Sequence, residues 1–499
     1  MIETIIEAVA RHAMDRPDAQ ALTDGSTSLS WSEVSAWITD AAGWLLDLGL
    51  PRGASVLGWL PNGLEWYLIR LACEQAGFFW VPVPTSQGKR ELASILERTR
   101  PSVLVTKEHF RDHDYKVEAD ELCVQLGLDP LHITAPDEGL LRLAGRPKAS
   151  SQPLRLDEPA HALATSGSEG TPKLAIYTLM AACRRAHAQA QLLKLTAGDK
   201  ILVLSPGTGP ARVGWLAAPI AGSCVTAMPR FGTRAAMELI QSMGVTIVCG
   251  TPAQLAMLVP KLGEADTSSV RIWYAVGSVM PPTLGQDLES QTKGIVISNY
   301  GGSDFGGWAA PDIDAAPAVR HRTVGRPQGD TEFRIVDDQC SDLPAGQVGE
   351  LIGRGPCSIS GFLGEEGRQA WRDGWFHTGD LASMDGDGNL VIVGRLKEVI
   401  VRGGDKVSPV EIEALLRTHN SVAQVAVIGV PDSVLGERIC AFVVVTPGQD
   451  PPTLESLRGY LEDQGLAHYK TPERLVVLGS MPIVGDKIDR RALAAIAAG

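Results

Sequence analysis

Short apolar runs alternate with helix-patterned segments through the first 300 residues. Runs at 54–59 and 78–83 flank segment 65–76, whose apolar residues recur at helical spacing. Buried-type runs at 245–249 and 272–276 continue the alternation. Strands that alternate with helices form parallel sheets covered on both faces. This part of the chain is therefore predicted to be a large α/β domain built of doubly wound sheets.

Two helix starts can be placed from capping signals. Ser30 precedes apolar positions at helical spacing and has Glu33 three residues later, while Thr251 stands directly before Pro252. A hydroxyl at such a position accepts a hydrogen bond from the first helical turn. We therefore expect helices after both residues. Segment 107–159 is polar with weak periodicity, and we interpret it as a surface connection.

The pattern changes after residue 332. Short strands separated by Asp-Gly and Gly-Asn pairs, as in 385–389, predict a small β subdomain up to residue 393. Beyond it the chain has its own helix and strands at 410–416, 425–428 and 439–445. We therefore predict two domains, a large N-terminal one over 1–394 and a small α+β C-terminal one over 395–499.

The composition argues against several classes of protein. The net charge of −13 argues against a sequence-independent nucleic-acid binder, which needs a basic face. The eight cysteines are scattered without a CxxC pair, and the first 16 residues lack the order of a signal peptide, so we expect a cytoplasmic protein with reduced thiols. The most hydrophobic stretch, 59–83, carries Glu65, Arg70 and Glu74, which argues against a membrane span.

A loop rich in hydroxyls follows the apolar run 162–164. Between Thr165 and Lys173 it holds four hydroxyls, two glycines and a lysine, a composition that suits a polyphosphate. It is not a P-loop, because that motif needs a lysine directly after its second glycine and a helix that starts there, whereas here Pro172 precedes Lys173. A simple surface turn would explain the loop taken alone. Since strands of an open sheet present their carboxyl ends to ligands, we expect loops 165–173, 205–212, 277–281 and 300–307 to share one crevice.

Four later stretches complete a pattern. They are Tyr300-Gly301-Gly302-Ser303-Asp304, the segment 375–380 ending in Asp380, the segment 394–413 with Arg395 and Gly403-Gly404, and the segment 482–490 with Lys487. In this order they resemble the adenylate-forming superfamily of acyl-CoA and aryl-CoA synthetases, nonribosomal adenylation domains and luciferases. The resemblance extends from Pro17 to Arg490. It implies ATP, Mg²⁺ and coenzyme A as cofactors and a mobile C-terminal domain. The implied reaction joins a carboxylic acid to AMP and passes the acyl group to CoA or a carrier protein.

The resemblance also implies roles for individual residues. The triphosphate would be held by Thr165, Ser166, Gly167, Ser168, Gly170, Thr171 and Lys173. The adenine would be bound by Gly277, Ser278, Asn299, Tyr300 and Gly301. Ser303 would contact the α-phosphate, and Asp304 would be the Mg²⁺ ligand. Asp380 would hold the ribose with help from Arg395. The catalytic set would be Lys487, Ser303, Asp304 and Thr165. Lys397 would be the hinge, and Gly403 and Gly404 would line the pantetheine tunnel.

The acyl pocket departs from the superfamily pattern. The resemblance would line it with Gly207, Arg212, Val213, Gly277, Gly301, Gly302 and Gly307. Segment 207–212 lacks the usual aromatic residue and histidine, and it also lacks the aspartate that amino-acid activators place there. A buried substrate ammonium would then have no counter-charge, which argues against amino acids. Small residues leave room for a ring or a branched chain, and Arg212 could meet a polar substituent.

Three readings stay open. The first is an acid–CoA ligase for an aromatic, cyclic or medium-sized acid. The second is an adenylating enzyme that passes the acyl group to a carrier protein or an amine. The third is a catalytically silent nucleotide-binding relative, suggested by Asp304 in place of glutamate, the missing pocket histidine, and Asp486 beside Lys487. A serine hydrolase is discounted because Phe305 breaks the GxSxG pattern. The sequence does not give the oligomeric state.

Overall fold

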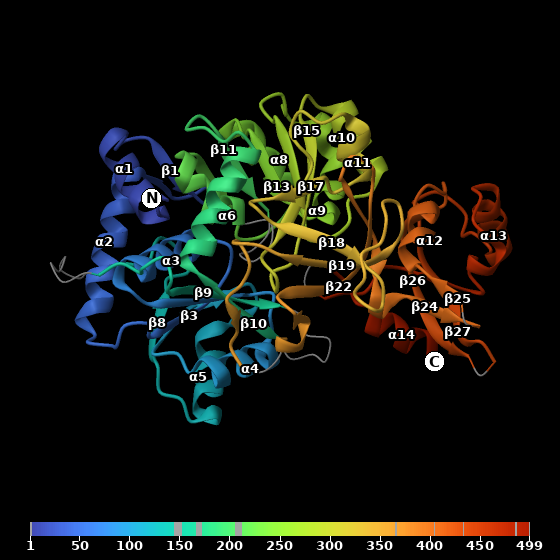
Figure 1. Cartoon of the computed structure of the whole chain (residues 1–499). Helices are drawn as coiled ribbons and strands as arrows, with labels where there is room; N and C mark the ends of the chain where they lie inside the picture. Colours follow the sequence, from blue (N-terminus) through green and yellow to red (C-terminus); the bar gives the residue numbers. More distant parts are fainter. Residues whose placement is uncertain are drawn as a thin grey trace. The chain divides into compact units, whose positions relative to one another are not determined.

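The computed structural model describes residues 2–143, 152–165, 172–204, 212–364, 367–403, 405–432, 434–484 and 487–498. The chain divides into two compact units (Figure 1). Unit 1 comprises residues 1–332 and 353–376, and unit 2 comprises residues 333–352 and 377–499. The structure is of the mixed α/β class that the alternating pattern predicts.

Two large sheets form the interior of unit 1. The nine-stranded sheet has the order β17 (Arg326–Gln328), β16 (Trp308–Ala310), β15 (Ile295–Gly301), β14 (Ile272–Val276), β13 (Ile247–Gly250), β11 (Lys200–Val203), β12 (Cys224–Ala227), β1 (Gln20–Thr23), β2 (Ser28–Ser30). The seven-stranded sheet has the order β20 (Gly361–Phe362), β10 (Lys173–Thr178), β9 (Pro159–Thr165), β4 (Phe79–Pro84), β3 (Ser55–Leu60), β5 (Val103–Lys107), β8 (Leu131–Ala135). Strands β11, β13, β14 and β15 run parallel as direct neighbours, so the loops that follow them leave the same edge.

Helices pack against both sheets. In chain order they are α1 (Ile5–Asp15), α2 (Trp31–Asp47), α3 (Leu64–Ala76), α4 (Lys89–Thr99), α5 (Tyr115–Leu126), α6 (Leu179–Leu192), α7 (Ala218–Ala221), α8 (Thr233–Met243), α9 (Pro252–Leu258), α10 (Pro282–Gln291) and α11 (Pro317–Arg322). Ser30 and Thr251 cap α2 and α9 through complete capping boxes, as predicted. A π-helical turn over Val213–Ala217 precedes α7.

Segment 107–159 is more ordered than its sequence indicates. It holds α5, β8 and a hairpin of β6 (His109–Phe110) and β7 (His113–Asp114). Helix α5 buries Tyr115, Ala119, Leu122 and Cys123 at helical spacing. Charged residues between these positions dilute the periodic signal, and for that reason the helix was not predicted.

Unit 2 contains most of a five-stranded sheet and a separate α+β layer. The first sheet has the order β18 (Glu332–Val336), β19 (Gly349–Arg354), β22 (Trp375–Met384), β21 (Trp371–Arg372), with β23 (Leu390–Arg395) paired to β22. The second comprises β25 (Asp405–Val407), β24 (Ile400–Arg402), β27 (Gly436–Val445), β26 (Val422–Asp432) and β28 (Arg474–Leu478). The remaining elements are α12 (Pro409–Leu416), α13 (Leu454–Asp463), β29 (Ile483–Val484), β30 (Lys487–Ile488) and α14 (Arg490–Ala498).

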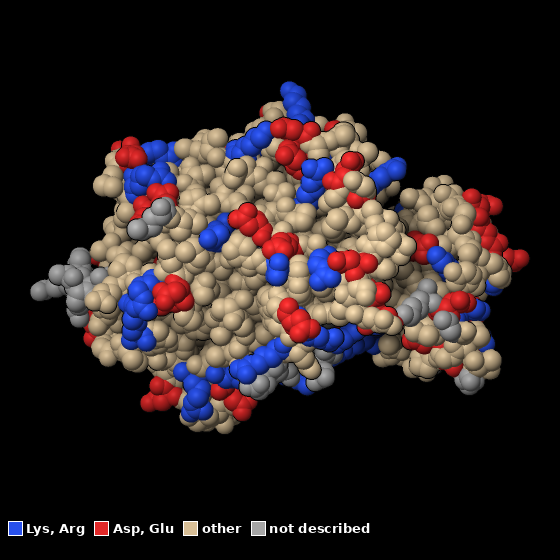
Figure 2. Space-filling view, viewed as in Figure 1, with Lys and Arg blue, Asp and Glu red and all other residues tan. Residues whose placement is uncertain are grey.

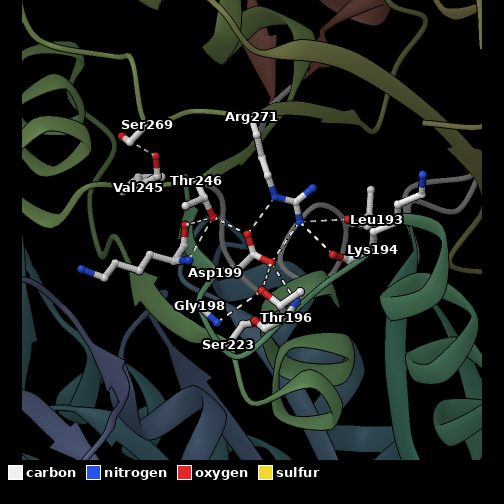
Figure 3. A network of polar contacts seen from close by, with 11 residues as sticks. Leu193, Lys194, Thr196, Gly198, Asp199, Ser223, Val245, Thr246, Ser269 and Arg271 are labelled. Carbon is white, nitrogen blue, oxygen red and sulfur yellow. Dashed lines mark hydrogen bonds and ion pairs between the residues drawn. The ribbon is translucent and has the colours of Figure 1, made fainter. Parts of the chain in front are cut away.

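A buried carboxylate joins three segments at the amino-terminal side of the parallel strands (Figure 3). Asp199 accepts two bonds from Arg271, Nε at 2.8 Å and Nη2 at 3.0 Å, and one from Thr246 Oγ1 at 2.7 Å. The backbone N–H of Thr196 donates to the same carboxylate at 2.8 Å. Burial raises the pKa of Asp199, but these hydrogen bonds outweigh it and hold the pKa below the usual value. The network fixes the end of the sheet opposite to the carboxyl ends of these parallel strands.

Charged side chains of both signs lie on the face of the molecule drawn in Figure 2. On the face drawn in Figure 2, basic side chains mostly lie beside acidic ones, which differs from the basic surface that a nucleic-acid backbone requires. No helix in the described part of the chain is long and apolar enough to cross a membrane.

Candidate functional site

The described ends of the hydroxyl-rich loop lie opposite each other. Thr165 ends β9 and Lys173 begins β10, and the two are Cα partners in the antiparallel pair. The Oγ1 of Thr165 is buried without a hydrogen-bond partner among the described atoms. Such an orphaned hydroxyl is available to a ligand oxygen. The remaining predicted residues of this loop, Ser166, Gly167, Ser168, Gly170 and Thr171, lie outside the described residues.

The predicted adenine-binding residues leave neighbouring strands of the nine-stranded sheet. Asn299 on β15 pairs with Val276 on β14, so Tyr300 and Gly277 follow at the same edge. Gly277 has a φ of +105°, which favours glycine, and Ser278 beside it is exposed. Asn299 is buried, and its Oδ1 has no partner among the described atoms. This edge therefore offers exposed backbone and one orphaned amide oxygen.

A buried arginine holds the loop that follows β15. Arg212 is 6% exposed, and its Nη2 donates to Ser303 Oγ at 2.8 Å and to Tyr177 OH at 3.4 Å. The Tyr177 hydroxyl donates in turn to the Ser303 carbonyl at 2.8 Å. The bond from Arg212 uses a lone pair of the Ser303 hydroxyl and keeps its O–H as a donor. The arrangement ties β10 of one sheet to the exit of β15 in the other and places a cation beside Ser303.

The carboxylate of Asp304 lies close to the backbone of this loop. A Cβ added at Gly302 would come within 2.6 Å of Asp304 Oδ1. The carboxylate therefore folds back over Gly302, one residue from the Ser303 hydroxyl. Carboxylate oxygen is the ligand type that Mg²⁺ prefers, and Mg²⁺ is usually held by one or two carboxylates together with phosphate oxygens. Among the described residues no cluster of three or more His, Cys, Asp or Glu side chains forms a self-sufficient metal site.

Tyr177 belongs to a cluster of aromatic side chains with His161 and Trp215. The ring of His161 on β9 stacks on Tyr177 with centroids 5.0 Å apart, and the indole of Trp215 meets His161 edge-on at 5.0 Å. Burial, followed by the charges of Arg70 and Arg212, holds the pKa of His161 well below its usual value. His161 is therefore a neutral spacer at neutral pH. Sequence analysis missed its place beside the site.

Sequence analysis also missed Arg185 on α6. Its guanidinium lies over the indole of Trp308, 4.1 Å from the centroid, and Nη1 donates to the Gly306 carbonyl at 3.4 Å. A signal was present in the sequence: positions 182, 185, 186 and 189 form one buried face of α6, and two of them, Arg185 and Gln189, are polar. A polar residue on an otherwise apolar helix face is informative.

The glycines of the predicted acyl pocket pack closely against protein atoms. A Cβ at Gly307 would come within 2.1 Å of the Phe305 ring, and one at Gly301 within 3.2 Å of the Gly307 carbonyl. At Gly306, whose φ is +89°, the Cys357 carbonyl lies 2.4 Å from the added Cβ. These glycines permit close packing of the loop rather than opening space around themselves. Val213 is buried in the π-helical turn, and Gly207 lies outside the described residues.

Unit 2 brings two of the predicted residues together. Asp380 on β22 and Arg395 on β23 are Cα partners, and Arg395 Nε lies 2.9 Å from Asp380 Oδ1. Lys397, the predicted hinge, is exposed in a short 3-10 turn. Gly403, with a φ of +59°, joins β24 to β25, whereas Gly404 lies outside the described residues. Lys487 begins β30, which pairs with β29, and its side chain is not described.

The residues of unit 1 fit an adenine nucleotide with its metal. Thr165 and Asn299 present orphaned oxygens, Ser303 a hydroxyl polarised by Arg212, and Asp304 a carboxylate. The two hydroxyls can donate to phosphate oxygens, the Asn299 oxygen can accept from an amino group such as that of adenine, and the Asp304 carboxylate is one hard ligand for Mg²⁺. Of the two residues predicted to line the pantetheine tunnel of coenzyme A, the structure describes only Gly403.

Known proteins resemble the chain along nearly all of its length. Residues 9–363 match the AMP-binding enzyme family, and residues 411–485 match the AMP-binding enzyme C-terminal domain. A 2-hydroxy-7-methoxy-5-methyl-1-naphthoate–CoA ligase of Streptomyces carzinostaticus is 31% identical, over 98% of this chain and 92% of the relative. A salicyl-AMP ligase/salicyl-S-ArCP synthetase of Mycobacterium tuberculosis (strain ATCC 25618 / H37Rv) is 32% identical, over 99% and 90%. The structure of the amide bond synthetase McbA from Marinactinospora thermotolerans superposes with a TM-score of 0.84, at 25% identity and over 99% of both chains.

Proposed function

The chain belongs to the AMP-binding enzyme family of adenylate-forming ligases, and we propose that it activates a small carboxylic acid with ATP and transfers the acyl group to coenzyme A. The acid is aromatic, cyclic or medium-sized. The first step forms acyl-AMP and pyrophosphate, and the second forms the thioester and AMP. The naphthoate–CoA ligase and salicyl-AMP ligase among its relatives, both named for aromatic acids, support this choice.

The observation that carries the proposal is the triad of Arg212, Tyr177 and Ser303 beside Asp304. Adenylation crowds negative charge around the α-phosphorus as the carboxylate attacks, so catalysis needs fixed donors and cations at that point. The triad supplies the Ser303 hydroxyl as a donor and a guanidinium whose Nη2 lies 2.8 Å from it. Arg212 holds the Ser303 side chain and Tyr177 holds the Ser303 carbonyl. A serine on a surface turn would need neither.

We assign the site residues the roles that the family resemblance implies, and the contacts of Ser303 and Arg212 support theirs. Ser303 donates to an α-phosphate oxygen, and Arg212 lowers the cost of negative charge there. Thr165 donates to the pyrophosphate, and Asp304 would hold Mg²⁺, which neutralises the phosphates when bound. Asp380, oriented by its ion pair with Arg395, accepts the ribose hydroxyls. Lys487 brings an ammonium to the attacking carboxylate in the first half-reaction. The small domain then rotates about Lys397 and brings Gly403 and Gly404 to the pantetheine arm.

Two half-reactions measured separately test the proposal. A panel of aryl, alicyclic and fatty acids is screened for acid-dependent exchange of labelled pyrophosphate into ATP. Lys487→Ala is expected to abolish thioester formation from acid and ATP while preserving it from preformed acyl-AMP. Equal loss in both assays would contradict the two-step assignment. Absence of exchange with every acid would favour a silent nucleotide-binding protein.

A second candidate differs only in the acceptor. The likeness to an amide bond synthetase and to an enzyme named as a salicyl-S-ArCP synthetase favours an amine or a carrier protein in place of CoA. The preferred acid from the panel is incubated with ATP and one of three acceptors: CoA, a phosphopantetheinylated carrier protein, or free amines. Faster turnover with amine or carrier protein than with CoA would replace our first choice.

A further inference from the structure

Helix α6 buries a charged residue inside unit 1. Arg185 is 6% exposed and shares its helix face with Ala182, Ala186 and Gln189. Its guanidinium reaches the loop after β15, where it covers the Trp308 indole and donates to the Gly306 carbonyl. This is the same loop that carries Ser303, three residues before Gly306. Arg185 therefore lies beside the candidate site without being part of the triad described above.

The charge of Arg185 is not compensated within the described chain. No carboxylate of the described residues forms an ion pair with it, and its buried Nε has no hydrogen-bond partner there. Burial lowers the pKa of Arg185 to about 10, so the guanidinium remains charged at neutral pH. A buried cation with one long hydrogen bond is costly unless an anion joins it. None of the described residues supplies that anion, which leaves a place for an anionic ligand.

The groups around Arg185 are neutral or positive. Gln189, one helical turn on, donates from Nε2 to the hydroxyl of Tyr274 at 2.8 Å, and its buried Oε1 has no partner among the described atoms. Arg212 acts on Arg185 as a like charge that lowers its pKa, after burial, which is the largest cause. The hydroxyl of Tyr274 accepts from Gln189 and keeps its O–H as a donor. The neighbourhood therefore combines cations and hydroxyl donors and suits an anion.

The phosphate is not the best partner for this cation. Arg212 already stands at Ser303, where the proposed reaction places the α-phosphate. Arg185 contacts Gly306 and Trp308, which flank Gly307, a residue that the family resemblance places in the acyl pocket. A carboxylate on the acyl portion of the substrate would complete a charge-assisted hydrogen bond with the Nε–H of Arg185.

We propose that the activated acid carries a second anionic group, a carboxylate, and that Arg185 binds it while the first carboxylate reacts. The inference rests on the proposed acid activation and specifies its substrate as a dicarboxylic acid. Monocarboxylic acids of the same skeleton, which lack the second anionic group, would leave Arg185 unpaired in the complex. The enzyme therefore selects dicarboxylates by the cost of that unpaired charge.

Matched pairs of acids test this inference. Pyrophosphate exchange is measured with benzoate against phthalate and isophthalate, and with valerate against glutarate, using the full-length chain. Wild type is expected to show a kcat/KM at least about tenfold higher for the better dicarboxylate of a pair, since charge-assisted bonds are of that strength. Arg185→Met is expected to lose this preference by lowering kcat/KM for the dicarboxylate alone. Arg184→Met, at an exposed neighbour, serves as the matched control and leaves both values unchanged.

The outcomes separate the two proposals. Equal loss with all acids in Arg185→Met would assign Arg185 to the shared phosphate and overturn the inference. Exchange with monocarboxylates but with no dicarboxylate would overturn it too, while acid activation would stand. No exchange with any acid would overturn both. Thermal unfolding adds a readout: Arg185→Met removes an uncompensated charge, so an unchanged or higher Tm is expected, whereas a lower Tm would assign the arginine to structure.

Discussion

Replacing Arg212 by methionine tests the triad at the centre of the site. The Arg212 guanidinium donates to Ser303 Oγ at 2.8 Å and is 6% exposed, so water cannot substitute for it. A hydrogen bond from a charged donor contributes about 1.5–3 kcal/mol. Since about 1.4 kcal/mol corresponds to a factor of ten, Arg212→Met should lower kcat/KM for adenylation by about tenfold to a hundredfold. The loss should fall mainly on kcat, because the cation acts where charge develops.

The measurement is pyrophosphate exchange with the preferred acid, paired with thioester formation from synthetic acyl-AMP. The second assay should change less than the first, because no phosphorus is attacked in that step. Tyr177→Phe is the companion variant. It removes the hydroxyl that holds the Ser303 carbonyl at 2.8 Å but keeps the ring that stacks on His161. A smaller loss than that of Arg212→Met is expected, since no charge is removed.

A double-mutant cycle supplies the refutation. If Arg212 acts through the Ser303 hydroxyl, the double variant Arg212→Met, Ser303→Ala should be little worse than the poorer single variant. Additive losses would mean that Arg212 and Ser303 act independently, and the argument from the triad would fail. Unchanged kcat in Arg212→Met, with a normal Tm, would refute it more directly.

The remaining predictions concern the support of the site and its metal. Asp199→Asn should lower stability by about 2–4 kcal/mol, because it leaves Arg271 without its carboxylate. Because the pKa of Asp199 is lower in the folded than in the unfolded protein, where it is near 4, the ionised carboxylate stabilises the fold at pH values above about 4. This stabilisation is lost as the pH falls through the folded pKa. The difference in Tm between wild type and Asp199→Asn should therefore shrink in acid. Gly306→Ala should reduce Tm and activity together, because its Cβ would come within 2.4 Å of the Cys357 carbonyl. Asp304→Asn should raise the Mg²⁺ concentration needed for half-maximal exchange, and an unchanged requirement would argue against Asp304 as the ligand.

The sequence predicts the parts of the fold that depend on local pattern. The helix caps at Ser30 and Thr251 and the strand at 272–276 are readable because each follows from spacing or from one residue type. The family and fold class are confirmed by matches over most of the chain. Helix α5 was missed because its apolar spacing is diluted by charge. The roles assigned to Lys487 and the other site residues remain predictions.

The significance of several residues beside the candidate site depends on tertiary contacts. Phosphate-handling loops are recognisable because they join strand ends and concentrate glycine and hydroxyl residues. Arg185 and His161 instead lie within a helix and a strand, and their significance appears only when Trp308 and Tyr177 are found against them. From the sequence, Arg212 could meet a polar substituent of the acid. In the structure its guanidinium contacts Ser303 and that of Arg185 contacts Gly306, and on these contacts we base the proposal that Arg185 binds the acid.

The different contacts of Arg212 and Arg185 have a physical consequence for the choice among acids. A cation that faces the phosphate works for every acid, so its loss lowers all rates together. A buried cation that faces the acyl group works only when the acid supplies an anion, since otherwise its desolvation stays uncompensated. Arg212 and Arg185 are equally buried and act on each other as like charges, so a monoanionic acid balances them less well than a dianionic one. Measured selectivity among acids should therefore follow Arg185, while turnover common to all of them should follow Arg212.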